Sequence, residues 1–204
     1  MSKFTHLHVH SHYSLLDGLP KIGELVAYTK ELGMDAIALT DHGAMYGIVE
    51  FYQACTKAGI KPIIGVEVYV APNGHTEKRS KIDDEHHHLI LLAENEVGYR
   101  NLIKLVTISH LEGFYYRPRV DHQLLEQYHE GLICLSGCLK GEIPTAILSG
   151  NTKQTKELLL WHKKTFGQGN FFLELQDHPN LPNQEIVNTA LIDLGKKFDV
   201  PLVA

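Results

Sequence analysis

The sequence contains little that would mark a secreted, membrane-spanning or strongly basic protein. Its three cysteines are an odd number without disulfide-scaffold spacing, so we expect free thiols or a metal ligand rather than bridges. The longest apolar runs, such as LILLA at 89–93, are far too short to cross a bilayer, and the first residues do not have the pattern of a signal peptide. These absences predict a cytoplasmic protein without membrane contacts.

The charge balance argues against one common mode of nucleic-acid binding. A net charge of −5 and an isoelectric point near 6.3 do not favour binding through bulk positive potential, although a local basic patch or a bound metal could still contact DNA. The sequence also lacks the Gly-x-Gly-x-x-Gly and Gly-x-x-x-x-Gly-Lys-Ser/Thr patterns of nucleotide-binding loops. With 204 residues, 44% of them apolar, the chain can bury one substantial core, and we expect a single domain over 1–204.

Apolar runs of strand length alternate with segments of helical periodicity along the whole chain. This alternation is typical of parallel strands joined by right-handed crossover helices, in an open sheet or in a barrel. Because the nucleotide-binding loops of the open sheet are missing, we expect an α/β barrel. The predicted strands are 4–10, 36–40, 62–70, 88–93, 131–136, 170–175 and 200–204. The predicted helices are 21–33, 44–59, 97–111, 121–129, 152–166 and 183–198.

Side chains that can bind metals follow the ends of several predicted strands. The carboxyl ends of such strands meet at one edge of a sheet or one face of a barrel, so we expect these side chains to converge. Imidazole, carboxylate and thiolate ligands together suit zinc or another borderline divalent ion, whereas magnesium and calcium prefer oxygen ligands alone. The candidates are His8, His10, Asp41, His42, Glu67 and Cys138.

The first predicted strand has a histidine at every second position between 6 and 12. Residues two apart on a strand point to the same face, so a His-x-His pair can hold one ion from one side. Strand parity alone does not show which two of these histidines are ligands. Two further histidines stay open: His88 lies at the start of a predicted strand rather than at its end, and His178 follows the sixth strand within ordinary turn sequence.

Five stretches stand out together in the chain: HLHVHSHYSLLDG (6–18), ALTDHGAMYGIVEFYQACTKAGIKPIIGVEVYVAP (38–72), HLILLAENEVGYRNLIKLV (88–106), GLICLSGCLKGEI (131–143) and FFLELQDH (171–178). In this order they resemble the PHP (polymerase and histidinol phosphatase) domains, and in particular the one at the N-terminus of bacterial replicative DNA polymerase III alpha subunits. The resemblance covers nearly the whole chain. A single His-x-His motif would support it weakly, whereas several long stretches in order are specific.

The resemblance implies a distorted, TIM-like barrel of seven β/α units whose carboxyl-end face holds two or three divalent metal ions, with zinc or manganese expected. Seven of the nine ligands usual in the family have matches in this sequence. By analogy, the first ion would take His8, His10 and Glu67, the second Asp17 and His42, and the third Glu67, His88 and Cys138. The implied metal ligands are therefore His8, His10, Asp17, His42, Glu67, His88 and Cys138.

The two remaining family ligands form an Asp-x-His pair just after the seventh strand, and this chain stops at PLVA before such a pair. The resemblance thus implies a barrel truncated at its C-terminal end and taken from a much larger polypeptide. Without the pair, the first two ions would each lack one ligand, so we expect the fragment alone to have little or no activity.

The activity implied by the resemblance is metal-dependent phosphoester hydrolysis. Two neighbouring divalent ions can hold a phosphate oxygen, activate a water molecule and stabilise the leaving oxygen. In the polymerase family the substrate would be the 3′ end of a DNA strand, and the activity 3′–5′ exonucleolytic proofreading. The catalytic residues would be His8, His10, His42 and Glu67.

Arg117 and Arg119 could contact DNA phosphates, although a basic turn packed on the barrel rim explains them equally well. In the full-length protein, a DNA-directed DNA polymerase, the implied partners are DNA, a separate proofreading exonuclease subunit and the sliding clamp. Two alternatives stay open. One is a noncatalytic scaffold that binds the proofreading subunit, and the other is a stand-alone phosphatase of the histidinol phosphatase type.

Overall fold

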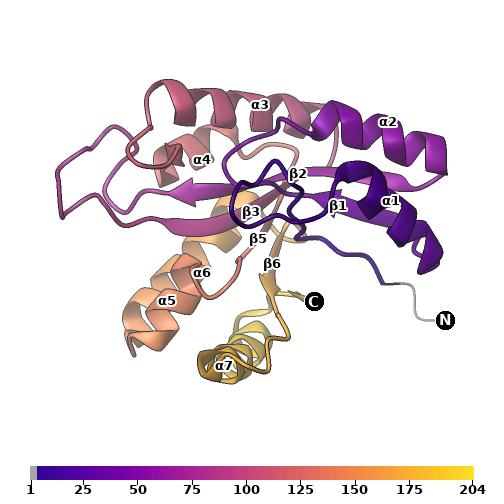
Figure 1. The fold of residues 1–204 in the computed structure, drawn as a ribbon. Helices are drawn as coiled ribbons and strands as arrows, with labels where there is room; N and C mark the ends of the chain where they lie inside the picture. The colour runs from indigo at the N-terminus through magenta and orange to yellow at the C-terminus, as the bar shows by residue number, and fades with distance from the viewer. Residues whose placement is uncertain (1–3) are drawn as a thin grey trace.

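The strands form one mixed sheet that curls into a half-barrel (Figure 1). The computed structural model describes residues 4–204. The strands follow one another in the order β1-β2-β3-β5-β6-β7, and β4 pairs with β2. Neighbouring strands are parallel except at β3, which runs antiparallel to β2 and β5. The strands are β1 (Ala36–Leu39), β2 (Lys61–Val70), β3 (His87–Ala93), β4 (Arg119–Val120), β5 (Leu132–Leu135), β6 (Phe171–Glu174) and β7 (Leu202–Val203).

Helices cover the outer side of the curled sheet (Figure 1). In the first half of the chain they pack against β1, β2 and β3, and in the second half against β3, β5 and β6. Within residues 4–204, no helix has the length and hydropathy needed to cross a membrane. The helices are α1 (Ile22–Glu31), α2 (Ile48–Ala58), α3 (Glu96–Leu111), α4 (His122–Tyr128), α5 (Glu142–Leu148), α6 (Thr152–Phe166) and α7 (Pro182–Phe198).

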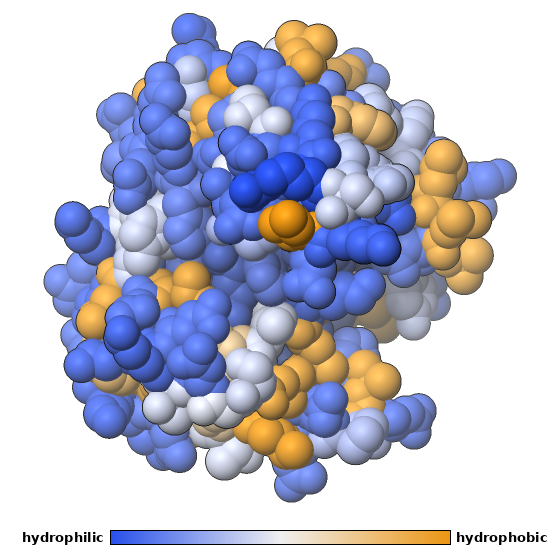
Figure 2. Space-filling model, turned by 90° about the vertical axis from the view of Figure 1, so that its left-hand side faces the viewer, coloured by the Kyte–Doolittle hydropathy of each residue, from blue (hydrophilic) through white to orange (hydrophobic). Residues whose placement is uncertain are grey.

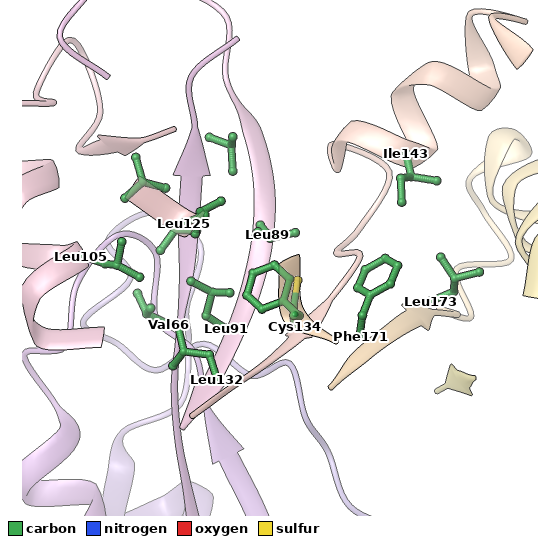
Figure 3. Close-up of a cluster of buried hydrophobic side chains, with 14 of the residues drawn as sticks. Val66, Leu89, Leu91, Leu105, Leu125, Leu132, Cys134, Ile143, Phe171 and Leu173 are labelled. Carbon is green, nitrogen blue, oxygen red and sulfur yellow. The ribbon is translucent and has the colours of Figure 1, made fainter. Parts of the chain in front are cut away.

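Alternation along the strands separates an outer core from an inner face. Val66 and Leu91 are opposite each other in the β2–β3 register and point outward into the main core beneath the helices (Figure 3). The next opposite pair, Glu67 and Ile90, must therefore point inward. The inner face carries a small apolar cluster together with a buried carboxylate. That apolar cluster contains Ala38, Ile90, Leu92 and Leu135.

The end of the molecule that carries the loop between β2 and β3 has a mostly polar surface (Figure 2). The hydrophobic residues visible on this face lie in separate patches rather than in one continuous surface. Scattered apolar residues are ordinary on the surface of a folded protein.

The prediction of a uniformly parallel sheet is wrong at β3. The segment 71–86, which joins β2 to β3, contains no helix, so the chain turns back and β3 pairs antiparallel with β2. A parallel neighbour would require a crossover of a dozen or more residues, usually a helix. Because of this reversal, the first residues of β3 lie beside the carboxyl-terminal half of β2.

Three other elements differ from the prediction. The structure assigns no strand to 4–10. This segment nevertheless lies alongside β1, to which it is joined by backbone hydrogen bonds from Ala38 N to His6 O (2.9 Å) and from Thr40 N to Val9 O (2.8 Å). The two-residue strand β4 and the short helix α5 were not predicted. The two residues of β4 are too few to produce a periodic pattern, and α5 contains Pro144, which argues against a helix in the sequence. The barrel-type α/β architecture is otherwise confirmed.

Candidate metal centre

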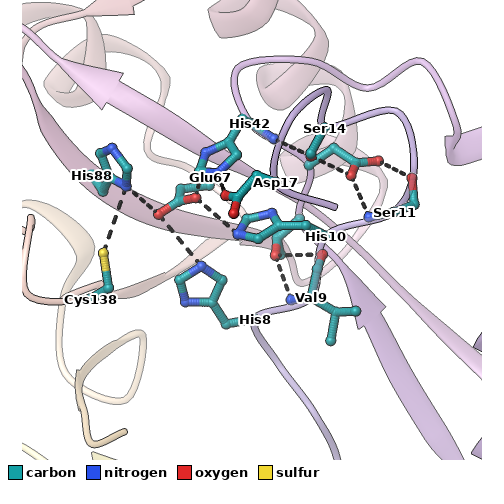
Figure 4. Close-up of polar contacts among 12 residues, drawn as sticks. His8, Val9, His10, Ser11, Ser14, Asp17, His42, Glu67, His88 and Cys138 are labelled. Atoms are coloured by element: carbon teal, nitrogen blue, oxygen red, sulfur yellow. Dashed lines mark hydrogen bonds and ion pairs between the residues drawn. The ribbon is translucent and has the colours of Figure 1, made fainter. Parts of the chain in front are cut away.

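The carboxylate of Glu67 lies at the centre of a ring of imidazoles (Figure 4). Glu67 is almost completely buried on the inner face of β2. Its Oε1 is 2.8 Å from His88 Nδ1 and 3.5 Å from His8 Nε2. Its Oε2 is 2.7 Å from His42 Nδ1 and 3.2 Å from His10 Nε2. One buried carboxylate thus contacts side chains from four separate positions in the chain.

The sheet register explains why these residues meet. His8 and His10 alternate along the segment beside β1, so both imidazoles face the same side. His42 follows β1 and forms an isolated parallel bridge with Glu67 on the neighbouring strand. The bridge includes a hydrogen bond from Gly43 N to Glu67 O (2.8 Å). The carboxyl end of β1 therefore places His42 directly beside Glu67.

The antiparallel direction of β3 explains the position of His88. His88 lies at the start of its strand, which would place it far from the carboxyl ends of a uniformly parallel sheet. In the antiparallel register it pairs instead with Tyr69, two residues after Glu67. Cys138 follows β5, and its Sγ is 3.7 Å from His88 Nδ1. Both residues consequently face the same inner site.

A compact loop holds Asp17 at the edge of the site. The buried side chain of Asp41 accepts hydrogen bonds from Ser11 N, Ser11 Oγ and Ser14 Oγ at 2.7–2.8 Å. Ser14 Oγ in turn accepts a hydrogen bond from His42 N (3.1 Å). The exposed carboxylate of Asp17 reaches His42 Nε2 at 2.5 Å. Asp41, which the sequence also offered as a candidate ligand, instead anchors the loop that carries Asp17.

The donor atoms form three overlapping groups, each within 4.8 Å. The first group matches the first ion implied by the family resemblance. The second adds His10 to the expected pair of Asp17 and His42. In the third, His42 accompanies Glu67 and His88 in place of Cys138, which belongs to no such group among residues 4–204. The groups are His8, His10 and Glu67; His10, Asp17 and His42; and His42, Glu67 and His88.

Several polar atoms in this ring are buried without a hydrogen bond. His42 Nδ1 and Glu67 Oε2 are 2.7 Å apart, yet neither atom has a hydrogen-bond partner among the described residues. Buried polar groups are normally hydrogen-bonded or bound to an ion. Imidazole nitrogens and carboxylate oxygens converging in this way are a donor set that divalent transition metals accept. The residues present therefore fit a metal centre.

Burial and neighbouring charges shift the pKa values of several groups in this cluster. Burial alone would raise the pKa of Glu67, but the surrounding imidazoles hold it far below its usual range. Burial lowers the pKa of His8, but Glu174 and Glu67 outweigh it and raise the pKa to about 10. Burial raises the pKa of the Cys138 thiol to about 11. A metal ion must therefore displace protons from His8 and Cys138, whereas the carboxylate of Glu67 is already ionised.

The site opens into a cavity of about 510 Å³. All seven ligands implied by the resemblance lie on its wall, and His178, which the sequence left open, lies there as well. Sequence reasoning missed Gln176, Gln184 and Lys140, although Gln176 follows β6 and Lys140 follows β5, where the rule of strand ends applies. The lining residues are His8, His10, Asp17, His42, Glu67, His88, Cys138, Leu139, Lys140, Gln176, His178, Leu181 and Gln184.

Residues 6–178 match the family model described as the PHP domain. The chain belongs to this family. The resemblance inferred from the five sequence stretches is thus confirmed, and the buried cluster around Glu67 lies within the matched part of this PHP domain.

The PHP domain is similar over its whole length to much longer proteins. It is 51% identical to the DNA polymerase III subunit alpha of Borreliella burgdorferi and 46% identical to that of Aquifex aeolicus. Each alignment covers 100% of this chain but only 18% of the relative. The chain therefore spans less than a fifth of the length of these relatives.

Two solved structures share the fold. A metal-dependent phosphoesterase from Bifidobacterium adolescentis superposes with a TM-score of 0.61 at 12% identity, over 97% of this chain and 85% of its own. An amidohydrolase from Chromobacterium violaceum gives a TM-score of 0.60 at 13% identity, over 97% of this chain and 84% of its own. At such low identity the likeness shows the architecture alone.

Of the two explanations left open for Arg119, the structure favours the packed turn over a DNA contact. Its side chain is fully buried in the PHP domain. The guanidinium donates hydrogen bonds to four backbone carbonyls: Gly113 O (3.1 Å), Asp83 O (2.9 Å), His75 O (3.1 Å) and Glu77 O (2.7 Å). Four of the five N–H donors of this buried side chain are thus used within the protein, and Arg119 ties the β2–β3 loop to the segment before β4.

Arg117 lies in a different environment. Its exposed guanidinium is 5.8 Å from the centre of the Tyr69 ring. The same ring stacks on His42, with centroids 5.8 Å apart and an interplanar angle of 8°. Arg117 is therefore separated from the candidate metal ligands by a single aromatic ring, and its contact with DNA stays a prediction.

Proposed function

We propose that this PHP domain is the N-terminal domain of a bacterial replicative DNA polymerase III alpha subunit and hydrolyses phosphoesters at the Glu67 centre. The observation that supports it most is the buried carboxylate of Glu67, which is surrounded by four imidazoles and whose Oε2 faces His42 Nδ1 without a hydrogen bond. The proposed ligands are His8, His10, Asp17, His42, Glu67, His88 and Cys138, holding two or three zinc or manganese ions.

Divalent ions in such a cluster would supply an activated water and neutralise the charge of the phosphate. The protein side chains have separate tasks. Asp17, at the exposed edge of the cavity, lies where a substrate enters. Lys140 is the single lysine or arginine on the described cavity wall, so it is placed to bind a phosphate oxygen. Arg117, just beyond Tyr69, would bind the next phosphate of a DNA strand.

The proposed substrate is the 3′ end of a DNA strand, and the proposed reaction is 3′–5′ exonucleolytic proofreading. In the full-length protein the same polypeptide would act as DNA-directed DNA polymerase in the cytoplasm, with the proofreading exonuclease subunit and the sliding clamp as partners. The high identity to polymerase subunits supports this assignment over a stand-alone phosphatase of the histidinol phosphatase type.

Metal analysis and a nuclease assay test the proposal. The full-length protein, purified without chelator, is expected to contain roughly two to three transition-metal ions per chain by elemental analysis. When no deoxynucleoside triphosphates are added, it should release mononucleotides from single-stranded DNA. Removal of the ions should abolish this release, and manganese should restore it. A protein that contains no transition metal and releases no mononucleotides would instead be the noncatalytic scaffold.

A second prediction concerns the phosphate contact. Lys140→Ala should raise the KM for single-stranded DNA about tenfold, because a hydrogen bond to a charged phosphate is lost, while metal content stays unchanged. Lys61→Ala is the matched control, since this exposed lysine begins β2 at the opposite end of the strand from the cavity. Equal KM values for the two variants would exclude Lys140 from substrate binding.

A further inference from the structure

Glu174 is a buried carboxylate that the family resemblance does not include among the ligands. It ends β6 on the inner face of the sheet and is 5% exposed. Its backbone N donates a hydrogen bond to Ser136 Oγ at the end of β5 (2.9 Å). The position of Glu174 is therefore set by the sheet rather than by a mobile loop.

The carboxylate of Glu174 contacts the Nδ1 side of the His8 ring, which is the side away from Glu67. Glu174 Oε1 is 2.7 Å from His8 Nδ1, and the same oxygen accepts a hydrogen bond from Gln176 Nε2 (2.7 Å). On the other side of the ring, His8 Nε2 is 3.5 Å from Glu67 Oε1. The imidazole thus lies between two buried carboxylates, one on each nitrogen.

This geometry determines which nitrogen of His8 can bind a metal. In the neutral imidazole that binds a metal ion, donation of the Nδ1 hydrogen to Glu174 leaves the lone pair on Nε2, and Nε2 faces Glu67 and His10. A carboxylate on the far nitrogen fixes the ring orientation and the tautomer of a metal-binding histidine and increases its basicity. His10 has no such support, since its Nδ1 is buried without a hydrogen-bond partner among the described residues.

We infer that Glu174 is a positioning residue, which holds His8 through Nδ1 so that Nε2 is directed into the metal centre. The inference rests on the proposed function, since it assumes metal ions at the Glu67 cluster. Glu174 belongs to none of the three donor groups found in residues 4–204, and its Oε1 is already engaged by His8 and Gln176. Its Oε2 is buried without a hydrogen-bond partner among the described residues, and the inferred role is exerted through Oε1 and the imidazole.

Metal affinity measured without catalysis tests this role. In the full-length protein, Glu174→Ala should weaken zinc binding to one site about 10- to 100-fold in competition with a chromophoric chelator. Glu174→Gln should recover much of the loss, because its amide oxygen can still accept the Nδ1 hydrogen of His8. With Co²⁺ in place of zinc, the visible absorption should change in Glu174→Ala and stay close to wild type in Glu174→Gln.

The matched control is Glu142→Ala, which removes another buried glutamate that pairs with a histidine, His122, outside this cavity (2.9 Å). If Glu174→Ala keeps wild-type affinity, or if both alanine variants lose affinity equally, the positioning role is wrong. A wild-type protein that binds zinc without releasing mononucleotides would overturn the hydrolytic proposal and leave the role of Glu174 standing. A wild-type protein that binds no zinc would overturn both.

Discussion

Replacing Glu67 with alanine is expected to remove more than one metal ion per chain and to slow mononucleotide release by at least about a thousandfold. The reason is that this carboxylate belongs to two of the three donor groups and also lies 3.2 Å from His10, a member of the other. Elemental analysis and a single-stranded DNA assay on the full-length protein measure both effects. Its two oxygens contact four of the candidate ligands, His8, His10, His42 and His88.

Glu67→Gln tests whether metal binding depends on the negative charge of this side chain or on its size. The amide retains the volume of the carboxylate but not its charge, so metal content should fall while the fold of the inner face is preserved. Glu94→Ala, at an exposed glutamate just after β3, is the control for loss of a negative charge elsewhere. Unchanged metal stoichiometry in Glu67→Ala would show that the ligand assignment carried over from the family is wrong.

Part of this site was accessible from sequence because it depends on local regularities. Alternation along an extended segment places His8 and His10 on one side, and the strand-end rule brings His42 to the same face. These regularities require no knowledge of the tertiary structure. The family resemblance added Asp17, whose position depends on an irregular loop that no periodicity predicts.

The rest of the site depends on how strands are paired, which periodicity does not encode. His88 violates the strand-end rule for a parallel sheet and satisfies it once β3 runs antiparallel. The position of Glu174 also depends on strand pairing. Its inward direction follows from the β5–β6 pairing, and its contact with His8 joins residues 166 positions apart. Sequence periodicity reports burial and spacing, whereas partner choice across the sheet requires the fold.

Arg119 shows the same limit for a charged residue. In the sequence it lies two residues from Arg117 in a basic turn, and nothing local distinguishes the two side chains. The structure separates them completely, since one guanidinium is buried against backbone carbonyls and the other is exposed beside Tyr69. The two residues are therefore expected to respond oppositely to substitution.

Arg119→Ala is expected to lower the free energy of unfolding by about 4 kcal/mol, measured by urea denaturation. The substitution removes the guanidinium from four backbone carbonyls, of which Gly113 O keeps a hydrogen bond from the backbone N of residue 119 (3.3 Å), and it empties the space of a fully buried side chain. Arg119→Lys should recover only part of the stability, because one ammonium group cannot reach acceptors distributed around a planar guanidinium.

Arg117→Ala provides the contrast. Its unfolding free energy should stay within about 0.5 kcal/mol of wild type, as for most exposed positions, because its side chain makes no hydrogen bond to the buried backbone carbonyls that Arg119 holds. Its affinity for single-stranded DNA, followed by fluorescence anisotropy, should fall and become less dependent on salt. If Arg119→Ala instead keeps its unfolding free energy and loses affinity for single-stranded DNA, Arg119 would have to leave its four carbonyl partners and bind a DNA phosphate. Because four short hydrogen bonds oppose that movement, we expect stability and DNA affinity to separate cleanly between these two arginines.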